Sequence, residues 1–193
     1  MTQIVGVAGS WRKGSYNAAL LKAAAELMPT GATLEIFSIR DIPLYDGDVE
    51  AEGELPEVVT RLKDALARSD GLLIATPEYN NSIPGTVKNA IDWLSRPASD
   101  IKRVFGGLPV GLLGASPGSG GTRMAQTAWL PVLRYLTAQP FLTSQITFGE
   151  AGKLFDGDGM LADERAKSKL SQYLAQFVDF ARAVRPLADE DTK

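Results

Sequence analysis

The sequence predicts an α/β fold in which a parallel sheet is covered by helices on both faces. Short apolar runs alternate with longer segments of helical periodicity from one end of the chain to the other. This alternation is typical of β-α-β units, in which each helix returns the chain to the same end of the sheet. With 193 residues the chain has the length of one domain, which we expect over residues 1–185, with a frayed C-terminal end at 186–193.

Each predicted strand is a short apolar run, and each predicted helix carries apolar residues at three- and four-residue spacing. Pro131 lies inside the fourth helical pattern, so a kink or a late start is expected there. The strands are predicted at residues 4–8, 34–39, 71–75, 109–115 and 141–148, and the helical patterns at residues 20–27, 56–66, 84–94, 129–136 and 170–184.

Five parallel strands favour a three-layer α/β/α sandwich with the strand order 2-1-3-4-5, which is the flavodoxin-like arrangement. In such a sheet the winding direction reverses between the first and third strands, and ligands bind there, beyond the carboxyl ends of the strands. The loops after Ala8, Ala75 and Ala115 are therefore the expected site.

Composition excludes several kinds of chemistry, because the chain contains no cysteine and no histidine. Thiolate nucleophiles, Cys/His zinc sites, iron–sulfur clusters and a Ser-His-Asp triad are ruled out, so an enzyme of this composition would take its chemistry from a cofactor. The net charge of −3, with both signs interspersed, indicates no nucleic-acid partner and no membrane surface, and we expect no metal site. We find neither a membrane span nor a signal peptide, so a cytoplasmic protein is expected.

The loop after the first predicted strand, residues 9–17, reads Gly-Ser-Trp-Arg-Lys-Gly-Ser-Tyr-Asn. It lacks the Lys-Ser/Thr pair of a triphosphate-binding loop. It offers short polar side chains, one arginine and the N-terminus of a helix, whose orphan N–H groups favour an anion. This set suits a single terminal phosphate, such as that of flavin mononucleotide (FMN). The alternative is a Ser/Asn-capped turn without a ligand.

The loop after the third predicted strand, residues 76–85, is bracketed by Pro77 and Pro84. Two prolines should make it stiff, so that it can present backbone groups to a flat heterocycle with little loss of entropy. Tyr79 would then pack at the edge of the ring. The alternative is an ordinary connection in which Tyr79 covers the core.

The loop after the fourth predicted strand contains Gly-Ala-Ser-Pro-Gly at residues 114–118, which matches the G-x-S-x-G pattern of a hydrolase nucleophile elbow. Because the chain has no histidine, we do not expect Ser116 to be a nucleophile. We favour a mobile glycine-rich turn whose backbone can approach a planar ligand closely. A flexible connection without a ligand is the alternative.

Four motifs stand out when the loops are taken together. They are Gly-Ser-x-Arg-x-Gly-Ser-x-Asn at 9–17, Ile-Pro-Leu-Tyr at 42–45, Thr-Pro-Glu-Tyr-Asn-x-Ser-x-Pro-Gly at 76–85 and Val-Lys-Asn-Ala-Ile-Asp-Trp-Leu-Ser at 87–95. Together they resemble the NADPH-dependent FMN reductase family, and within it the bacterial chromate and quinone reductases. The likeness runs from about residue 3 to residue 136, and it is most specific over 76–95.

This resemblance implies a bound FMN, with NADPH or NADH as co-substrate. Trp11 stands where the family has a small aliphatic residue, so the resemblance does not define the shape of the site entrance. The implied cofactor-binding residues are Ser10, Arg12, Ser15, Tyr16 and Asn17 around the phosphate, Pro77, Glu78, Tyr79 and Asn80 along the ribityl chain and isoalloxazine ring, and Ser116, Gly118 and Gly121 on the other side of the ring.

We therefore expect an FMN-dependent NAD(P)H oxidoreductase that works by ping-pong hydride transfer and uses no catalytic side chain. Its acceptors would be small molecules such as quinones, flavins, azo dyes, chromate or other metal oxyanions. A flavodoxin-type electron carrier and a non-catalytic FMN-binding redox sensor are the alternatives. The resemblance also implies a homodimer or homotetramer, in which Trp93 either anchors the partner or simply faces the sheet.

Overall fold

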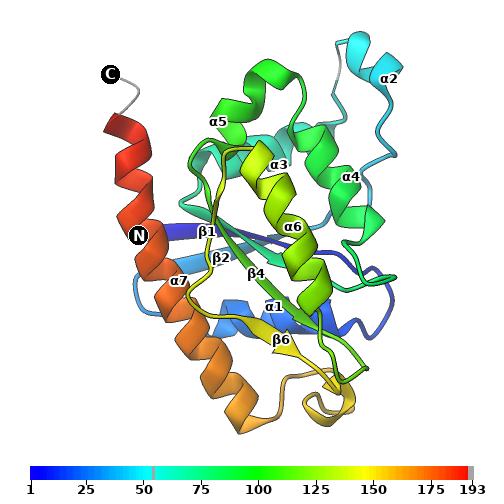
Figure 1. Ribbon diagram of the computed structural model, residues 1–193, viewed down its shortest axis with the longest axis vertical. Helices are drawn as coiled ribbons and strands as arrows, with labels where there is room; N and C mark the ends of the chain where they lie inside the picture. The colour runs from blue at the N-terminus through cyan, green and yellow to red at the C-terminus, as the bar shows by residue number, and fades with distance from the viewer. Residues whose placement is uncertain (54, 191–193) are drawn as a thin grey trace.

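A parallel sheet runs through the molecule, and helices cover both of its faces (Figure 1). The computed structural model describes residues 1–53 and 55–190, of which 185–190 are described by their backbone alone. The strand order β2-β1-β3-β4-β5 confirms the predicted flavodoxin-like arrangement, and β6 pairs with β4 as well. The strands are β1 (Thr2–Ala8), β2 (Ala32–Phe37), β3 (Gly71–Ala75), β4 (Pro109–Ala115), β5 (Gln139–Pro140) and β6 (Ile146–Phe148).

Alternate residues of the central strands feed two cores, one on each face of the sheet. On β1, Ile4 packs with α1 and α7, whereas Val5 and Val7 pack with the helices of the opposite face. Figure 1 shows α3, α4 and α6 on this opposite side of the strands from α1 and α7. The helices are α1 (Tyr16–Glu26), α2 (Gly47–Ala51), α3 (Glu57–Arg68), α4 (Gly85–Leu94), α5 (Ile101–Phe105), α6 (Arg123–Tyr135) and α7 (Glu164–Glu190), with 3-10 turns at Ala98–Asp100 and Ala151–Lys153.

The single fifth strand predicted at 141–148 is wrong, because β5 (Gln139–Pro140) ends before this segment and only β6 (Ile146–Phe148) lies within it. β5 pairs with the start of β4 and β6 pairs with its end. In the gap between them, the carbonyl of Leu112 accepts a hydrogen bond from the buried hydroxyl of Tyr173 at 2.9 Å. Burial raises the pKa of the Tyr173 hydroxyl well above its ordinary value, so it remains a proton donor to this carbonyl. A side chain of α7 thus takes the place of one bond of the interrupted strand pairing.

Other boundaries differ from the sequence prediction in smaller ways. The second strand lies at Ala32–Phe37, two residues earlier than predicted, and Ile39 joins the core beyond its end. α6 begins at Arg123, eight residues before Pro131, so the late start expected at that proline is wrong. The short helices α2 and α5 were not predicted. α7 continues past Pro186 to Glu190, and residues 191–193 of the expected frayed end lie outside the described residues.

Within the described residues, none of the helices combines the length and apolar character that crossing a bilayer requires.

Candidate functional site

The loops after β1, β3 and β4 meet at the carboxyl edge of the sheet, as predicted. Gly9 N donates to Ala75 O at 3.0 Å, and Thr76 N donates to Leu113 O at 2.8 Å. The hydroxyl of Thr86, at the start of α4, donates to Gly9 O at 2.7 Å. A Cβ at position 9 would lie 2.5 Å from Val87 and 2.7 Å from Pro77, so only glycine lets the first and third loops approach this closely.

The first loop provides donors suited to a phosphate. Ser15 is the N-cap of α1, and its Oγ accepts from Ala18 N at 3.2 Å, which leaves the hydroxyl proton able to point to an anion. Ser10 in the same loop is half-buried, and the exposed Arg12 adds a positive charge. A Cβ at Gly14 would have no neighbour within 4 Å, so the loop lies open to a ligand. These residues fit the terminal phosphate of FMN.

The Asn17 side chain has a different partner from the predicted phosphate. Its Oδ1 accepts from Ala115 N and its Nδ2 donates to Ala115 O, both at 2.9 Å. Asn17 is only 4% exposed, so this pair of bonds is shielded from water. It fastens the start of α1 to the end of β4 and thereby sets the spacing between the first and last loops.

Tyr16 also packs against protein. The centroid of its ring lies 5.3 Å from that of Phe155, and the Arg12 guanidinium lies 5.5 Å from the Tyr16 ring centroid. Tyr16 therefore connects the first loop to the segment that precedes α7.

The third loop is a tight turn with a defined backbone. Tyr79 N donates to Ser82 O at 3.2 Å and Ser82 N to Tyr79 O at 3.0 Å. Asn80 and Asn81 between them have φ of 51° and 57°, the left-handed values that a type I′ turn requires and that asparagine tolerates. Tyr79 is 48% exposed, so it does not cover the core as the alternative expected. The turn presents Tyr79 at the edge of the site.

Glu78 points to a helix instead of into solvent. Its Oε2 accepts from Met124 N at 2.8 Å and from Ala125 N at 3.1 Å, in the first turn of α6. Trp129 of the same helix donates from its indole N–H to Thr76 Oγ1 at 3.2 Å. The third loop is thus bound to α6 at two points.

The Ile-Pro-Leu-Tyr motif at 42–45 packs against α4 and forms hydrogen bonds with its side chains. Pro43 O accepts from Trp93 Nε1 at 2.9 Å and from Asn89 Nδ2 at 2.8 Å, and the ring of Tyr45 packs edge-on against Trp93. The Tyr45 hydroxyl donates to Glu50, and this bond raises the pKa of Tyr45. Trp93 is fully buried, so the suggestion that it anchors a partner chain is wrong and it faces the core.

The fourth loop, expected to be mobile, is held by the segment after β6. Ser116 N donates to Phe148 O, Ala151 N to Ser116 O and Glu150 N to Gly118 O, at 2.9 to 3.0 Å. The Ser116 hydroxyl bonds within its own turn, to Gly118 O at 3.1 Å. A Cβ at Gly118 would have only the Ser116 Oγ within reach, at 4.0 Å, so this stretch is open to a planar ligand.

Glycine at position 121 is explained by the backbone of the fold, without a ligand. Its φ is +65°, and a Cβ there would lie 2.6 Å from Thr147 O. Glycine is therefore required by the backbone conformation and by the contact with β6.

Sequence reasoning missed several contacts that position the loops. Arg40 Nη2 donates to Trp11 O at 2.6 Å, which ties the loop after β2 to the first loop. The segment 148–151 completes the fourth loop. The contact of this segment with the fourth loop could have been predicted, because β6 is parallel to β4 and ends at the same edge of the sheet.

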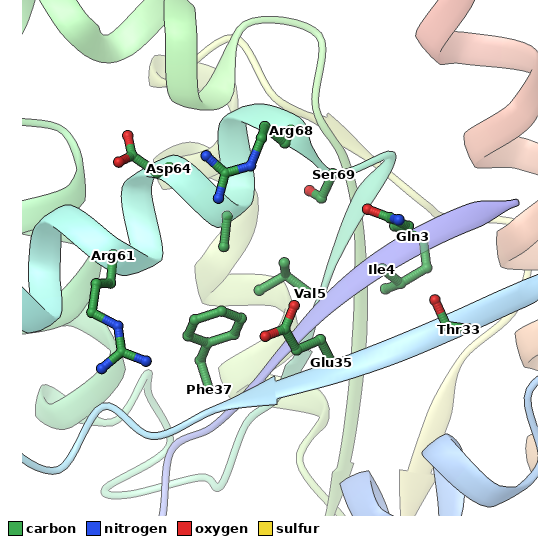
Figure 2. Close-up of a pocket in the computed structure, with 11 residues that line it drawn as sticks. Gln3, Ile4, Val5, Thr33, Glu35, Phe37, Arg61, Asp64, Arg68 and Ser69 are labelled. Carbon is green, nitrogen blue, oxygen red and sulfur yellow. The ribbon is translucent and has the colours of Figure 1, made fainter.

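Two hollows lie away from these loops. Figure 2 shows one of about 410 Å³ that Arg61 and Arg68 of α3 border on one side and Glu35 and Phe37 of β2 on the other. A second, of about 530 Å³, lies beside α2 and is lined by residues from Tyr45 to Leu55 and by Pro97. Neither hollow lies at the switch point of the sheet. The serine hydroxyls, Arg12 and the open glycines belong to the loops at the switch point. We place the candidate site at the switch point on this chemistry.

No cluster of three or more carboxylate, histidine or cysteine side chains suited to a metal ion occurs in the part of the chain that the structure describes.

The order of the strands and the three converging loops define a flavodoxin-like protein with a site for a phosphate-bearing, planar ligand. Residues 2–153 match the model of the NADPH-dependent FMN reductase family. The chain belongs to this family, which confirms the predicted oxidoreductase class, with FMN as cofactor and NAD(P)H as electron donor.

Individual relatives agree with this assignment. The chain is 40% identical over 183 residues to an NAD(P)H-dependent FMN reductase of Pseudomonas aeruginosa, covering 95% of this chain and 97% of that protein. It is 40% identical over 182 residues to a quinone reductase of Pseudomonas putida, covering 93% and 94%. Among solved structures, FerB, a flavoenzyme NAD(P)H:(acceptor) oxidoreductase from Paracoccus denitrificans, is similar with a TM-score of 0.85, 32% identity and coverage of 95% and 99%.

Proposed function

We propose that the protein transfers electrons from NAD(P)H to quinones through bound FMN. The observation that carries this proposal is the meeting of three loops with complementary chemistry at the switch point of the sheet. Relatives named as quinone reductases support quinones as the acceptor class. Flavins, azo dyes, chromate and other metal oxyanions are further candidates, predicted from the sequence.

Each loop has its own task in this proposal. Ser10, Arg12, Ser15 and the N-terminus of α1 hold the phosphate. The backbone of residues 77–80 lines the ring on one side, and the backbone from Ser116 to Gly118 lines it on the other. Bound FMN supplies the chemistry, by accepting a hydride from NAD(P)H and passing two electrons to the acceptor. The protein binds and orients the flavin and controls access, so no side chain is required as an acid, base or nucleophile.

The test is an anaerobic titration of the purified protein with NADPH and then NADH, followed by a benzoquinone. We expect the flavin absorbance near 450 nm to bleach on addition of the reduced nicotinamide, and to return when the quinone is added. No bleaching by either nicotinamide would support the electron carrier or the redox sensor instead. Initial rates at several fixed quinone concentrations then test the ping-pong scheme, which predicts parallel double-reciprocal lines.

We also propose that the protein works as a homodimer or homotetramer. Large apolar side chains lie exposed around the carboxyl edge of the sheet, and ligand pockets commonly form where two surfaces meet. Trp11 is 39% exposed, Leu44 85%, Tyr79 48% and Met124 54%. Light scattering should give at least twice the chain mass of 20.7 kDa. A fully active monomer at tens of micromolar would contradict this assembly. The cytoplasmic location expected from the sequence stays a prediction.

A further inference from the structure

The Glu78 carboxylate joins two of the loops that form the proposed flavin site. Both of its hydrogen bonds go to one oxygen, Oε2, from Met124 N and Ala125 N, 46 and 47 residues away in sequence. These amides belong to the first turn of α6, where backbone N–H groups have no partner within the helix. Thr122, at the N-cap position, provides no side-chain cap. Glu78 therefore supplies the cap of α6 from another loop.

This cap leaves the third loop little freedom. Thr76 N is bonded to Leu113 O on one side of Glu78, and the Tyr79–Ser82 turn closes with two backbone bonds on the other. Glu78 is the link between these two anchors, and it fixes the loop against α6. The backbone of residues 77–80 is thus held in one arrangement before any ligand arrives, which lowers the entropy lost on binding.

The charge of Glu78 matters as well as its reach. The N-terminus of a helix carries a partial positive charge of about half a unit. Here that end borders the proposed site, because α6 follows directly after the fourth loop. The carboxylate neutralises it. Reduction of a flavin adds negative charge, so a positive helix end at the site would favour the reduced form, and its neutralisation favours the oxidised form.

We propose that Glu78 is a positioning residue of the flavin site: it locks the loop 76–85 onto the start of α6, and by neutralising that helix end it keeps the reduction potential low. The inference rests on the proposed function, since it concerns the same FMN site. It assigns the side chain of Glu78 to α6, while its backbone remains part of the wall of the site.

Two variants separate the lock from the charge. Glu78→Gln keeps one carbonyl oxygen, which is able to accept both N–H bonds, but removes the charge. Glu78→Ala removes the hydrogen-bond acceptor and the charge. Glu164→Gln is the matched control, because it removes the same charge at the N-terminus of α7, where Glu164 is 83% exposed and paired with Lys167.

The lock is measured by FMN dissociation constants and, in FMN-free protein, by hydrogen exchange of the peptide that contains residues 123–126. Glu78→Ala should weaken FMN binding at least fivefold and speed exchange in this peptide. In Glu78→Gln, the FMN dissociation constant and the exchange rate of this peptide should lie within twofold of the wild-type values. A loss of less than fivefold in the alanine variant overturns the lock, and so does a glutamine variant that fails to restore binding.

The charge is measured as the midpoint potential of the bound flavin, against reference dyes. Glu78→Gln should favour binding of reduced over oxidised FMN by about fivefold more than the wild type, a rise of about 20 mV for a two-electron couple. Glu164→Gln should leave the potential unchanged. A potential in Glu78→Gln that is unchanged or lower refutes the electrostatic part. If the wild type bound no FMN, the proposed function would fail, while the exchange measurement on FMN-free protein would still decide whether Glu78 caps α6.

Discussion

Replacing Asn17 with alanine should destabilise the fold much more than it changes the recognition of phosphate. The substitution removes two hydrogen bonds and leaves the N–H and C=O of Ala115 without partners in a buried position. Each unsatisfied buried group costs about 1–3 kcal/mol, so the free energy of unfolding should fall by about 2–6 kcal/mol. For a domain of this size, that corresponds to roughly 2–4 °C in Tm for each kcal/mol.

The chain offers a matched control in Asn89. It also accepts from a backbone N–H, that of Tyr45, and donates to a backbone carbonyl, that of Pro43, both at 2.8 Å. These bonds are exposed, so water replaces them after truncation and Asn89→Ala should cost less than about 1 kcal/mol. Urea unfolding of the FMN-free variants gives both values.

Affinity measurements then decide what Asn17 does for the cofactor. Since FMN and riboflavin differ only in the phosphate, the ratio of their affinities is independent of general damage to the fold. We expect Asn17→Ala to keep this ratio within threefold of the wild-type value. An Asn17→Ala protein as stable as Asn89→Ala, but with a tenfold loss of preference for FMN over riboflavin, would refute this reasoning. It would indicate that Asn17 binds the phosphate.

Three further predictions concern Ser15, Asp100 and Ser116. Ser15→Ala removes a hydroxyl donor to an anion, worth about 1.5–3 kcal/mol, so the ratio of FMN to riboflavin affinity should fall at least tenfold, and an equal loss for both ligands would place the phosphate elsewhere. Hydrogen bonds from Arg103, then from Lys63, hold the pKa of the Asp100 carboxyl well below its ordinary value of 3.8. A depressed folded-state pKa contributes stability above the unfolded pKa, so urea midpoints should fall as the pH drops below about 4, and Asp100→Asn should show a shallower fall; an identical slope would contradict this role. Fluorophosphonate probes should not label Ser116, whose hydroxyl bonds to Gly118 O, and stoichiometric labelling would show that it is a nucleophile after all.

The sequence predicted those parts of the fold that depend on local pattern. β3 and β4 match their predicted bounds, because both are continuous apolar runs buried on both faces. The strand order followed from counting alternations, since connection rules leave few topologies. The division of the last strand into β5 and β6 was not predicted. At this interruption the Leu112 carbonyl is bonded by the hydroxyl of Tyr173, 61 residues away in sequence. No local pattern records such a contact.

The candidate site also has parts that the sequence predicted and parts that it did not. The position of the loops followed from the topology, and the hydroxyl and arginine donors of the first loop could be read directly from residue types. The partners of Asn17 and Glu78 could not, because each bonds to backbone of a distant segment, at Ala115 and at the start of α6. A polar residue in a binding motif has the same appearance in the sequence whether it faces the ligand or the protein.

This distinction changes what the family motif means in this chain. Gly9 is required by contacts between loops, Gly121 by its backbone conformation and its contact with β6, and the side chains of Asn17 and Glu78 are bonded to the protein's own backbone. The motif therefore encodes the relative placement of three loops as much as the contacts with FMN. Substitutions at Ser15, which we propose to bind the phosphate, should change selectivity between FMN and riboflavin. Substitutions at Asn17 should instead affect both flavins alike, together with stability, so one pair of titrations separates the two groups of motif residues.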